Sequence, residues 1–229
     1  NSIQNEYKNL HDFSTLGRMM IKTNQLDKAK DIFQILLKTT SNTNNIHRYL
    51  GYIYEKIKDY SRALSHYRSS LDGELQNKPV NHSTLAGIYA HIGMIEKEQN
   101  DFIQASKTFT NALKIVLNPR TLDLSMAFIL MNNLGEVFIS KGDYPNALKS
   151  FQEALKASRK SNSLKLEIVA DIHQNLSLVF DTLGQNNEAV QHASDAINIA
   201  KQKYGENHDK LKKYQDQYNR ITQKLQLST

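Results

Sequence analysis

The amino-acid sequence predicts an all-α protein built from consecutive helix hairpins and closed by one capping helix. Three observations lead to this fold class. Glycine and proline are rare, at 9 and 3 residues of 229, whereas a protein of many short strands needs turn residues about every ten positions. One spaced pattern of small and aromatic residues occurs five times along the chain. The last segment has a single apolar stripe with helical spacing.

Composition excludes several classes of protein. Apolar residues make up 39% of the chain and charged residues 23%, which is typical of a folded protein rather than a disordered one. With 0 Cys, the chain has no disulfide framework, no thiolate nucleophile and no cysteine-based zinc site. The longest apolar run, Met126 to Met131, is far shorter than the roughly 20 residues that span a bilayer. The first residues contain no apolar core of a signal peptide, so we expect a cytoplasmic protein without a membrane span.

The clearest copy of the repeated pattern predicts a pair of helices that cross closely. Leu134 and Phe138 are four residues apart, which places both side chains on one face of a first helix. Ala147 and Phe151 have the same spacing and lie on one face of a second helix. Gly135 and Ala147 are small residues where the two helices meet. A β-carbon on Gly135, or a longer side chain at Ala147, would push the helix axes apart.

A tight turn is predicted between these two helices at residues 141–145. Gly142 tolerates the left-handed backbone that ends the first helix, Asp143 can cap the second helix, and Pro145 suits its first turn. Corresponding turns are expected at residues 58–60, 100–102 and 184–187.

The other copies of the pattern follow at steps of 42 residues, except for a step of 34 between the first and the second. The small residues of their first helices are Gly17, Gly51, Gly93 and Ser177. The small residues of their second helices are Ala29, Ala63, Ala105 and Ala189. We therefore expect a lead-in at residues 1–9 and five repeats at residues 10–43, 44–85, 86–127, 128–169 and 170–207.

This pattern resembles the signature of the tetratricopeptide repeat (TPR) family, aromatic-x2-Leu-Gly-x2-Tyr followed by Ala-x3-Phe-x2-Ala. The fourth copy matches best, whereas the fifth has Ser177 in place of Gly and Ala193 in place of Phe. The resemblance covers about residues 10–200 and implies a right-handed superhelical solenoid of about five helix-turn-helix hairpins. A 42-residue step lengthens each helix of the standard repeat by roughly one turn, which is similar to the repeats of kinesin light chains.

Residues 208–229 are predicted to form a capping helix that covers the last repeat. Its apolar stripe, at steps of three and four, consists of Leu211, Tyr214, Tyr218, Ile221 and Leu225. Its basic residues that we expect in water are Lys212, Lys213 and Lys224. The chain has a net charge of +6, most of which comes from residues 201–229. Nucleic-acid binding is therefore an alternative for this segment, but its apolar stripe favours capping.

The sequence contains none of the motifs typical of an enzyme site. It lacks the phosphate-binding loop, the glycine-rich dinucleotide motif, the His-Glu-x2-His zinc motif and the Gly-x-Ser-x-Gly hydrolase motif. The 8 histidines are scattered, with no close pair at the spacing of metal ligands, so we predict no catalysis, no metal, no cofactor and no small-molecule substrate. His47 and His173 occupy the aromatic position of the repeat, where we expect half-buried packing.

The resemblance implies a concave groove that is lined by the first helix of each repeat and binds extended peptides. The groove positions carried over to this sequence are Arg48, Tyr52, His91, Lys97, Asn132, Asn133, Glu136, Asp171, Gln174, Asn175 and Asp181. An asparagine amide can donate to and accept from a peptide backbone at once, but Asn133 and Asn175 could equally satisfy a neighbouring helix. Arg48 and Lys97 near one end predict a partner segment with acidic and aromatic or aliphatic residues.

The main hypothesis is a non-catalytic scaffold or adaptor that binds a partner protein or peptide in the groove, similar to a kinesin light chain. One alternative is a regulatory or substrate-recruiting module of a larger enzyme, because the chain begins with Asn1 rather than Met. The other alternative is nucleic-acid binding by the basic C-terminal helix.

Overall fold

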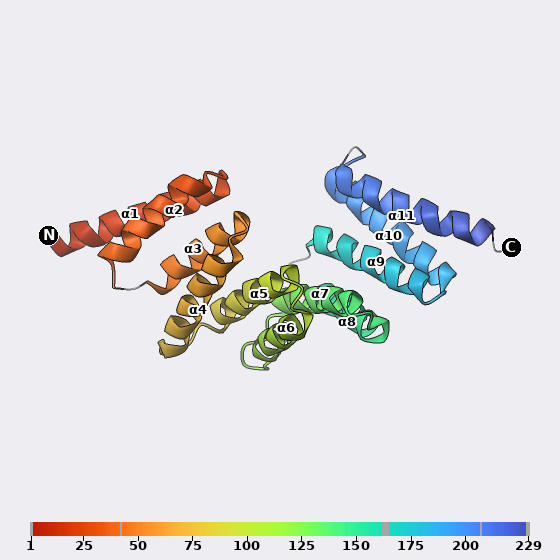
Figure 1. Cartoon of the computed structure of the whole chain (residues 1–229), viewed down its shortest axis with the longest axis horizontal. Helices are drawn as coiled ribbons and strands as arrows, with labels where there is room; N and C mark the ends of the chain where they lie inside the picture. Colours follow the sequence, from red (N-terminus) through yellow and green to blue (C-terminus); the bar gives the residue numbers. More distant parts are fainter. Residues whose placement is uncertain (1, 42, 162–164, 207, 228–229) are drawn as a thin grey trace. The chain divides into compact units, whose positions relative to one another are not determined.

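The computed structural model describes residues 2–41, 43–161, 165–206 and 208–227, and for residues 2–11 it describes the backbone alone. These residues form eleven helices and no strand, which confirms the predicted all-α class (Figure 1). The chain divides into two compact units, Asn1–Gln99 and Asn100–Thr229. None of the described helices combines the length and apolar character needed to cross a membrane.

The first unit contains five helices. They are α1 (Ser2–Lys22), α2 (Leu26–Thr39), α3 (Asn44–Lys56), α4 (Tyr60–Gln76) and α5 (His82–Glu98). α1 packs on α2 and α3 packs on α4, while α2 packs on α3 and α4 on α5. The core between them contains Phe33, Leu50 and Tyr67, each with no exposed surface. α1 extends over most of the predicted lead-in, because the apolar residues of that segment continue the helical spacing.

The second unit contains six helices in the described part of the chain. They are α6 (Phe102–Val116), α7 (Leu124–Ser140), α8 (Tyr144–Lys160), α9 (Leu166–Thr182), α10 (Asn186–Tyr204) and α11 (Asp209–Gln226). α7 pairs with α8 and α9 pairs with α10, while α6 packs on α7 and α11 packs on α10. The core around these hairpins includes the fully buried Phe128, Phe151 and Ile172.

Gly17, Gly51 and Gly135 of the repeat frame each lie against the aromatic ring of the second helix in their hairpin. A β-carbon on Gly135 would lie 2.5 Å from Cε1 of Phe151, and one on Gly51 would lie 2.8 Å from Cδ1 of Tyr67. These separations are far below an ordinary contact between carbon atoms. The predicted need for glycine at these helix crossings is thus confirmed. The aromatic ring of the second helix is the group that a β-carbon would meet.

The fourth repeat also has the predicted turn. Gly142 has a φ of 71°, the left-handed conformation that ends α7. Asp143 Oδ1 accepts a hydrogen bond from the backbone N–H of Asn146 at 3.3 Å, and Pro145 lies in the first turn of α8. Asp59 and Asp101 cap α4 and α6 in the same way.

Candidate functional site

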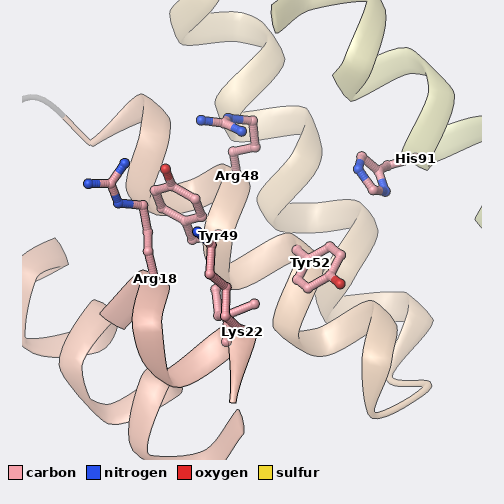
Figure 2. Close-up of a pocket in the computed structure, with 7 residues that line it drawn as sticks. Arg18, Lys22, Arg48, Tyr49, Tyr52 and His91 are labelled. Atoms are coloured by element: carbon pink, nitrogen blue, oxygen red, sulfur yellow. The ribbon is translucent and has the colours of Figure 1, made fainter. Parts of the chain in front are cut away.

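A pocket of about 240 Å³ lies in the first unit, where α1, α3 and α5 contribute side chains (Figure 2). Its lining residues are Arg18, Ile21, Lys22, Arg48, Tyr49, Tyr52 and His91. Three of the predicted groove residues, Arg48, Tyr52 and His91, are thus brought together. They come from the second and third predicted repeats, and α1 contributes side chains from the first predicted repeat.

Three cationic side chains line this pocket without a carboxylate partner in the described part of the chain. Arg18 and Lys22 are one turn apart on α1, and Arg48 lies on α3. The guanidinium groups make only neutral hydrogen bonds there, from Arg18 Nη2 to Thr15 Oγ1 at 3.1 Å and from Arg48 Nη2 to Asn45 Oδ1 at 3.0 Å. The described residues therefore form no ion pair that neutralises the positive charge of the pocket.

Aromatic rings form the walls of the pocket. Tyr49 stacks on Phe33 with 4.8 Å between ring centroids, and the Arg48 guanidinium carbon lies 4.9 Å from the Tyr49 centroid. Tyr52 meets the His91 ring edge-on at 5.9 Å. Stacked aromatic side chains have little rotational freedom, so these walls are rigid.

His91 is held in place by a partly buried hydrogen-bond network. Its Nδ1 lies 2.9 Å from Glu55 Oε2, and the Tyr67 hydroxyl donates to the same oxygen at 2.7 Å. The His91 ring also stacks on Tyr67 with 5.1 Å between centroids. Burial raises the pKa of Tyr67, so its hydroxyl keeps its proton and remains a donor. Glu55 thus orients His91 by accepting from Nδ1, which leaves Nε2 as the other polar atom of the ring.

Lys97 lies elsewhere in the same unit. It lines a second pocket of about 290 Å³ together with Glu55, Lys56 and Glu98, among others. This pocket contains charges of both signs, unlike the cationic pocket of Arg48. The structure therefore separates Lys97 from the other predicted residues of repeats two and three.

Three further predicted residues meet between α7 and α9 in the second unit. Glu136 Oε1 accepts hydrogen bonds from Asn132 Nδ2 at 3.0 Å and from Asn175 Nδ2 at 3.4 Å. The Asn175 amide thus contacts a neighbouring helix, which agrees with the structural alternative for this residue. In the described part of the chain, Asn133 makes no side-chain hydrogen bond, and the buried Oε1 of Gln174 has no donor.

The capping helix binds the first of the two predicted groove aspartates. Lys210 Nζ lies 2.8 Å from Asp171 Oδ2, and the Tyr214 hydroxyl donates to Asp171 Oδ1. Burial and the hydrogen bond to Asp171 raise the pKa of Tyr214, so this hydroxyl stays protonated. Asp171 therefore joins α9 to α11.

Asp181, in the last turn of α9, also joins α9 to the capping helix. Its side chain is only 5% exposed and accepts from Arg220 Nη2 at 2.6 Å and Lys224 Nζ at 2.9 Å. Together with Asp171, it lies against the capping helix rather than in an open groove. Lys224, which we expect in water, is 53% exposed and pairs with Asp181 from that position. Lys212 and Lys213 are exposed, as expected. Leu211 and Ile221 are fully buried, which confirms the predicted capping stripe.

Four lining residues of the cationic pocket were not predicted, and the repeat frame contains the signal that could have identified two of them. Arg18 follows Gly17 just as Tyr52 follows Gly51 in the next repeat. Tyr49 occupies the frame position that His91 occupies in the third repeat. Lys22 and Ile21 complete the set one turn further along α1. The first repeat contributed no groove residue to the sequence-based prediction, although α1 supplies part of the pocket.

The scattered histidines form two pairs, each between the helices of one hairpin. His47 Nδ1 lies 2.9 Å from His66 Nδ1, and His173 Nδ1 lies 3.0 Å from His192 Nδ1. All four side chains are partly buried, in agreement with the packing role expected for His47 and His173. The pairs join residues 19 positions apart, so sequence spacing concealed them.

The comparisons with known proteins agree with this architecture. Residues 125–202, which include most of α7 to α10, match the model of the tetratricopeptide repeat family. No curated protein sequence matches the chain.

Solved structures of other proteins share the fold. BtubC (BKLC) from P. vanneervenii has 16% sequence identity and a TM-score of 0.70, over 97% of this chain and 84% of that one. PilF of Pseudomonas aeruginosa has 17% identity and a TM-score of 0.64, over 96% and 97% of the two chains. PH0952 from Pyrococcus horikoshii, a signal-transduction ATPase with a tetratricopeptide repeat sensor, has 15% identity and a TM-score of 0.73, over 95% of this chain and 36% of that one. These likenesses confirm the predicted helical solenoid.

Proposed function

We propose, from the premise that this chain is built from tetratricopeptide repeats, that it is a non-catalytic scaffold which binds an extended segment of a partner protein. The observation that carries this proposal is the cationic and aromatic pocket of the first unit. The long repeats suggest a binding mode similar to that of kinesin light chains, in which the first helix of each hairpin contacts the segment.

The chemistry of the pocket favours a segment that combines a carboxylate with an aromatic or aliphatic side chain. Arg18, Lys22 and Arg48 supply positive charge, and an arginine can hold a carboxylate through two parallel hydrogen bonds. The Nε atom of Arg48 is buried and has no acceptor in the described part of the chain, so this guanidinium does not use all of its donors within the protein. Tyr49 and Tyr52 line the pocket and offer apolar ring surface to a neighbouring apolar side chain.

The first experiment uses a fluorescein-labelled peptide in which glutamate alternates with leucine and tyrosine, and measures its binding to the full chain by fluorescence polarisation. We expect saturable binding that weakens as salt concentration rises, because the charges meet at a partly exposed site. The matched peptide with glutamine in place of glutamate should bind at least about tenfold more weakly, since hydrogen bonds to charged groups contribute about 1.5–3 kcal/mol.

Two chain variants separate this pocket from general attraction to a basic protein. Arg48→Gln should weaken binding by about tenfold or more, while Lys213→Gln removes one exposed cation of α11 and should leave binding unchanged. Equal binding of the glutamate and glutamine peptides would refute the proposal. Equal losses in the two variants would also refute it, because they would show attraction to net charge alone.

A contact in the second unit is proposed at Asn133. Its amide is partly buried and makes no hydrogen bond in the described part of the chain, whereas the Asn175 amide already binds Glu136. We therefore expect Asn133→Ala to weaken binding of a long partner segment with little loss of stability. Asn175→Ala is expected to lower the melting temperature as well.

A second candidate role is that of a sensor or regulatory module within a larger protein. The likeness to PH0952 supports this role, because this chain corresponds to 36% of that signal-transduction ATPase. An open reading frame that continues into a catalytic domain would support a modular role. A reading frame limited to the repeats would count against it.

A further inference from the structure

His173, His192 and Asp195 form a compact cluster between the two helices of the fifth hairpin. His173 lies on α9, and the other two residues lie on α10. The Nδ1 atoms of the two histidines are 3.0 Å apart, and Asp195 Oδ2 lies 3.4 Å from His173 Nδ1. One ligand atom from each residue lies within 4.8 Å of the other two. Three side chains of metal-binding types therefore converge on one point.

Two of the three separations in this cluster are close to those of a metal site. Zn²⁺ binds imidazole nitrogen and carboxylate oxygen at about 2.0–2.2 Å, so two ligands of a tetrahedral site lie roughly 3.3 Å apart. The two shorter separations in the cluster, 3.0 and 3.4 Å, bracket this value. Two nitrogen ligands and one oxygen favour a transition-metal ion, because Ca²⁺ and Mg²⁺ prefer oxygen ligands alone.

Neighbouring side chains hold the cluster in this arrangement. The His192 ring stacks on Phe180 with 5.3 Å between centroids and 3° between planes. Gln191 Nε2 donates to Asp195 Oδ1 at 3.1 Å, so that Oδ2 is the oxygen nearest to His173. The side chain of His173 is 12% exposed and that of Asp195 is 35% exposed. An ion would therefore reach the histidines from the side of the carboxylate.

Both imidazoles are neutral at neutral pH, as metal ligands must be. Burial lowers the pKa of His192, and burial together with His192 lowers the pKa of His173 to about 4. In the ion-free chain one Nδ1–H donates to the other Nδ1, and an ion would take both lone pairs, with the ring protons on Nε2. The Arg159 guanidinium nearby opposes a cation, whereas the Asp195 carboxylate attracts one.

The second hairpin contains the same histidine pair without the carboxylate. His47 and His66 have their Nδ1 atoms 2.9 Å apart, and His66 stacks on Tyr54 at 5.4 Å and 4°. Ser69 occupies the position that corresponds to Asp195. The histidine pair thus joins the two helices in both hairpins, and the fifth hairpin adds a carboxylate to it.

We propose that His173, His192 and Asp195 bind one divalent transition-metal ion, with Zn²⁺ as the best match and water in the fourth position. The proposal concerns the second unit and does not depend on peptide binding in the first. A metal bridge between α9 and α10 would tie together the hairpin on which the capping helix packs.

The test titrates the full chain, freed of metal with EDTA, with Co²⁺ and records the visible absorption that reports nitrogen ligation in a tetrahedral site. Calorimetry with Zn²⁺ measures the same site without a spectroscopic probe. We expect one equivalent of each ion and a melting temperature that rises with Zn²⁺ concentration, because the ion binds the folded chain. Asp195→Ser, which copies the second hairpin, should weaken binding by about tenfold or more.

Two further variants make the result specific. His66→Gln should leave binding unchanged, and Ser69→Asp should add a second equivalent by giving the second hairpin its missing carboxylate. The proposal is overturned if the chain binds no Co²⁺, or if Asp195→Ser binds as tightly as the parent chain. In the latter case the ion would bind other histidines. If Asp195→Ser does not fold, the test depends on the number of ions that Ser69→Asp binds. Binding of a single equivalent by that variant would overturn the role of the carboxylate.

Discussion

Replacing Gly135 by alanine is expected to destabilise the fourth hairpin by about 1–2 kcal/mol. The new β-carbon would lie 2.5, 2.7 and 2.9 Å from three ring atoms of Phe151, about 1 Å closer than an ordinary contact. Phe151 has no exposed surface, so its ring has no open space to enter. Overpacking of this kind costs about 1–3 kcal/mol, and the better helix propensity of alanine offsets up to about 1 kcal/mol.

Gly87 supplies the matched control for this substitution. It also lies inside a helix, α5, but a β-carbon there would have no atom within 4 Å. Gly87→Ala is therefore expected to stabilise the chain by up to about 1 kcal/mol through helix propensity alone. The same chemical change should thus have opposite signs at the two glycines, because only one of them faces an aromatic ring.

The fifth repeat indicates how the clash at Gly135 can be relieved. That repeat has Ser177 and Ala193 where the fourth has Gly135 and Phe151. Phe151→Ala alone should cost about 3–5 kcal/mol, because it leaves a cavity in the core. The double variant Gly135→Ala/Phe151→Ala should be more stable than the sum of the two single effects, because the added methyl group partly fills that cavity.

The assay is urea denaturation of the full chain followed by circular dichroism, with melting temperature as a second readout. A loss of 1 kcal/mol corresponds to a fall of about 2–4 °C for a domain of this size. The reasoning is refuted if Gly135→Ala is as stable as the parent chain. Strict additivity in the double variant would likewise show that the ring does not limit the side chain at position 135.

Three further outcomes are expected. Ala147→Asp should destabilise the chain by about 3 kcal/mol or more in urea denaturation, because position 147 has no exposed surface and the carboxylate would be buried without a partner; an unchanged midpoint would show that the repeat frame is wrong. Asp181→Asn should lower the free energy of unfolding by about 1–3 kcal/mol and speed hydrogen exchange in α11, because it weakens the bonds from Arg220 and Lys224. Unchanged exchange would mean that these ion pairs do not hold the capping helix. Burial lowers the pKa of His47 and His66 below 6.5, so as the pH falls the unfolded chain binds protons before the folded chain does. The melting temperature should therefore fall as pH drops below 6.5. His66→Phe should flatten this dependence, and an unaltered pH profile in that variant would show that the buried histidine pair does not cause it.

Local patterns in the sequence were sufficient to predict the hairpins. Gly142 and Asp143 act within a few residues of their own position, so their backbone and capping roles can be read without knowledge of neighbouring helices. The apolar spacing of Leu211 and Ile221 likewise predicts a buried face of α11, because a helix with one apolar stripe must cover it. The repeat frame also placed Arg48, Tyr52 and His91 on first helices, where the structure brings them together in one pocket.

The partners of polar side chains depend on how neighbouring helices cross, and residue spacing does not contain that information. Asp171 was expected in the groove, yet the packing of α11 brings Lys210 against it from 39 positions away. The histidines of the fifth hairpin are scattered in the sequence, but the crossing of α9 and α10 places their nitrogens within hydrogen-bonding distance. Sequence periodicity therefore specified the helices and their buried faces, whereas the rotation of each helix about its axis decided which charges are neutralised and which remain open to a partner.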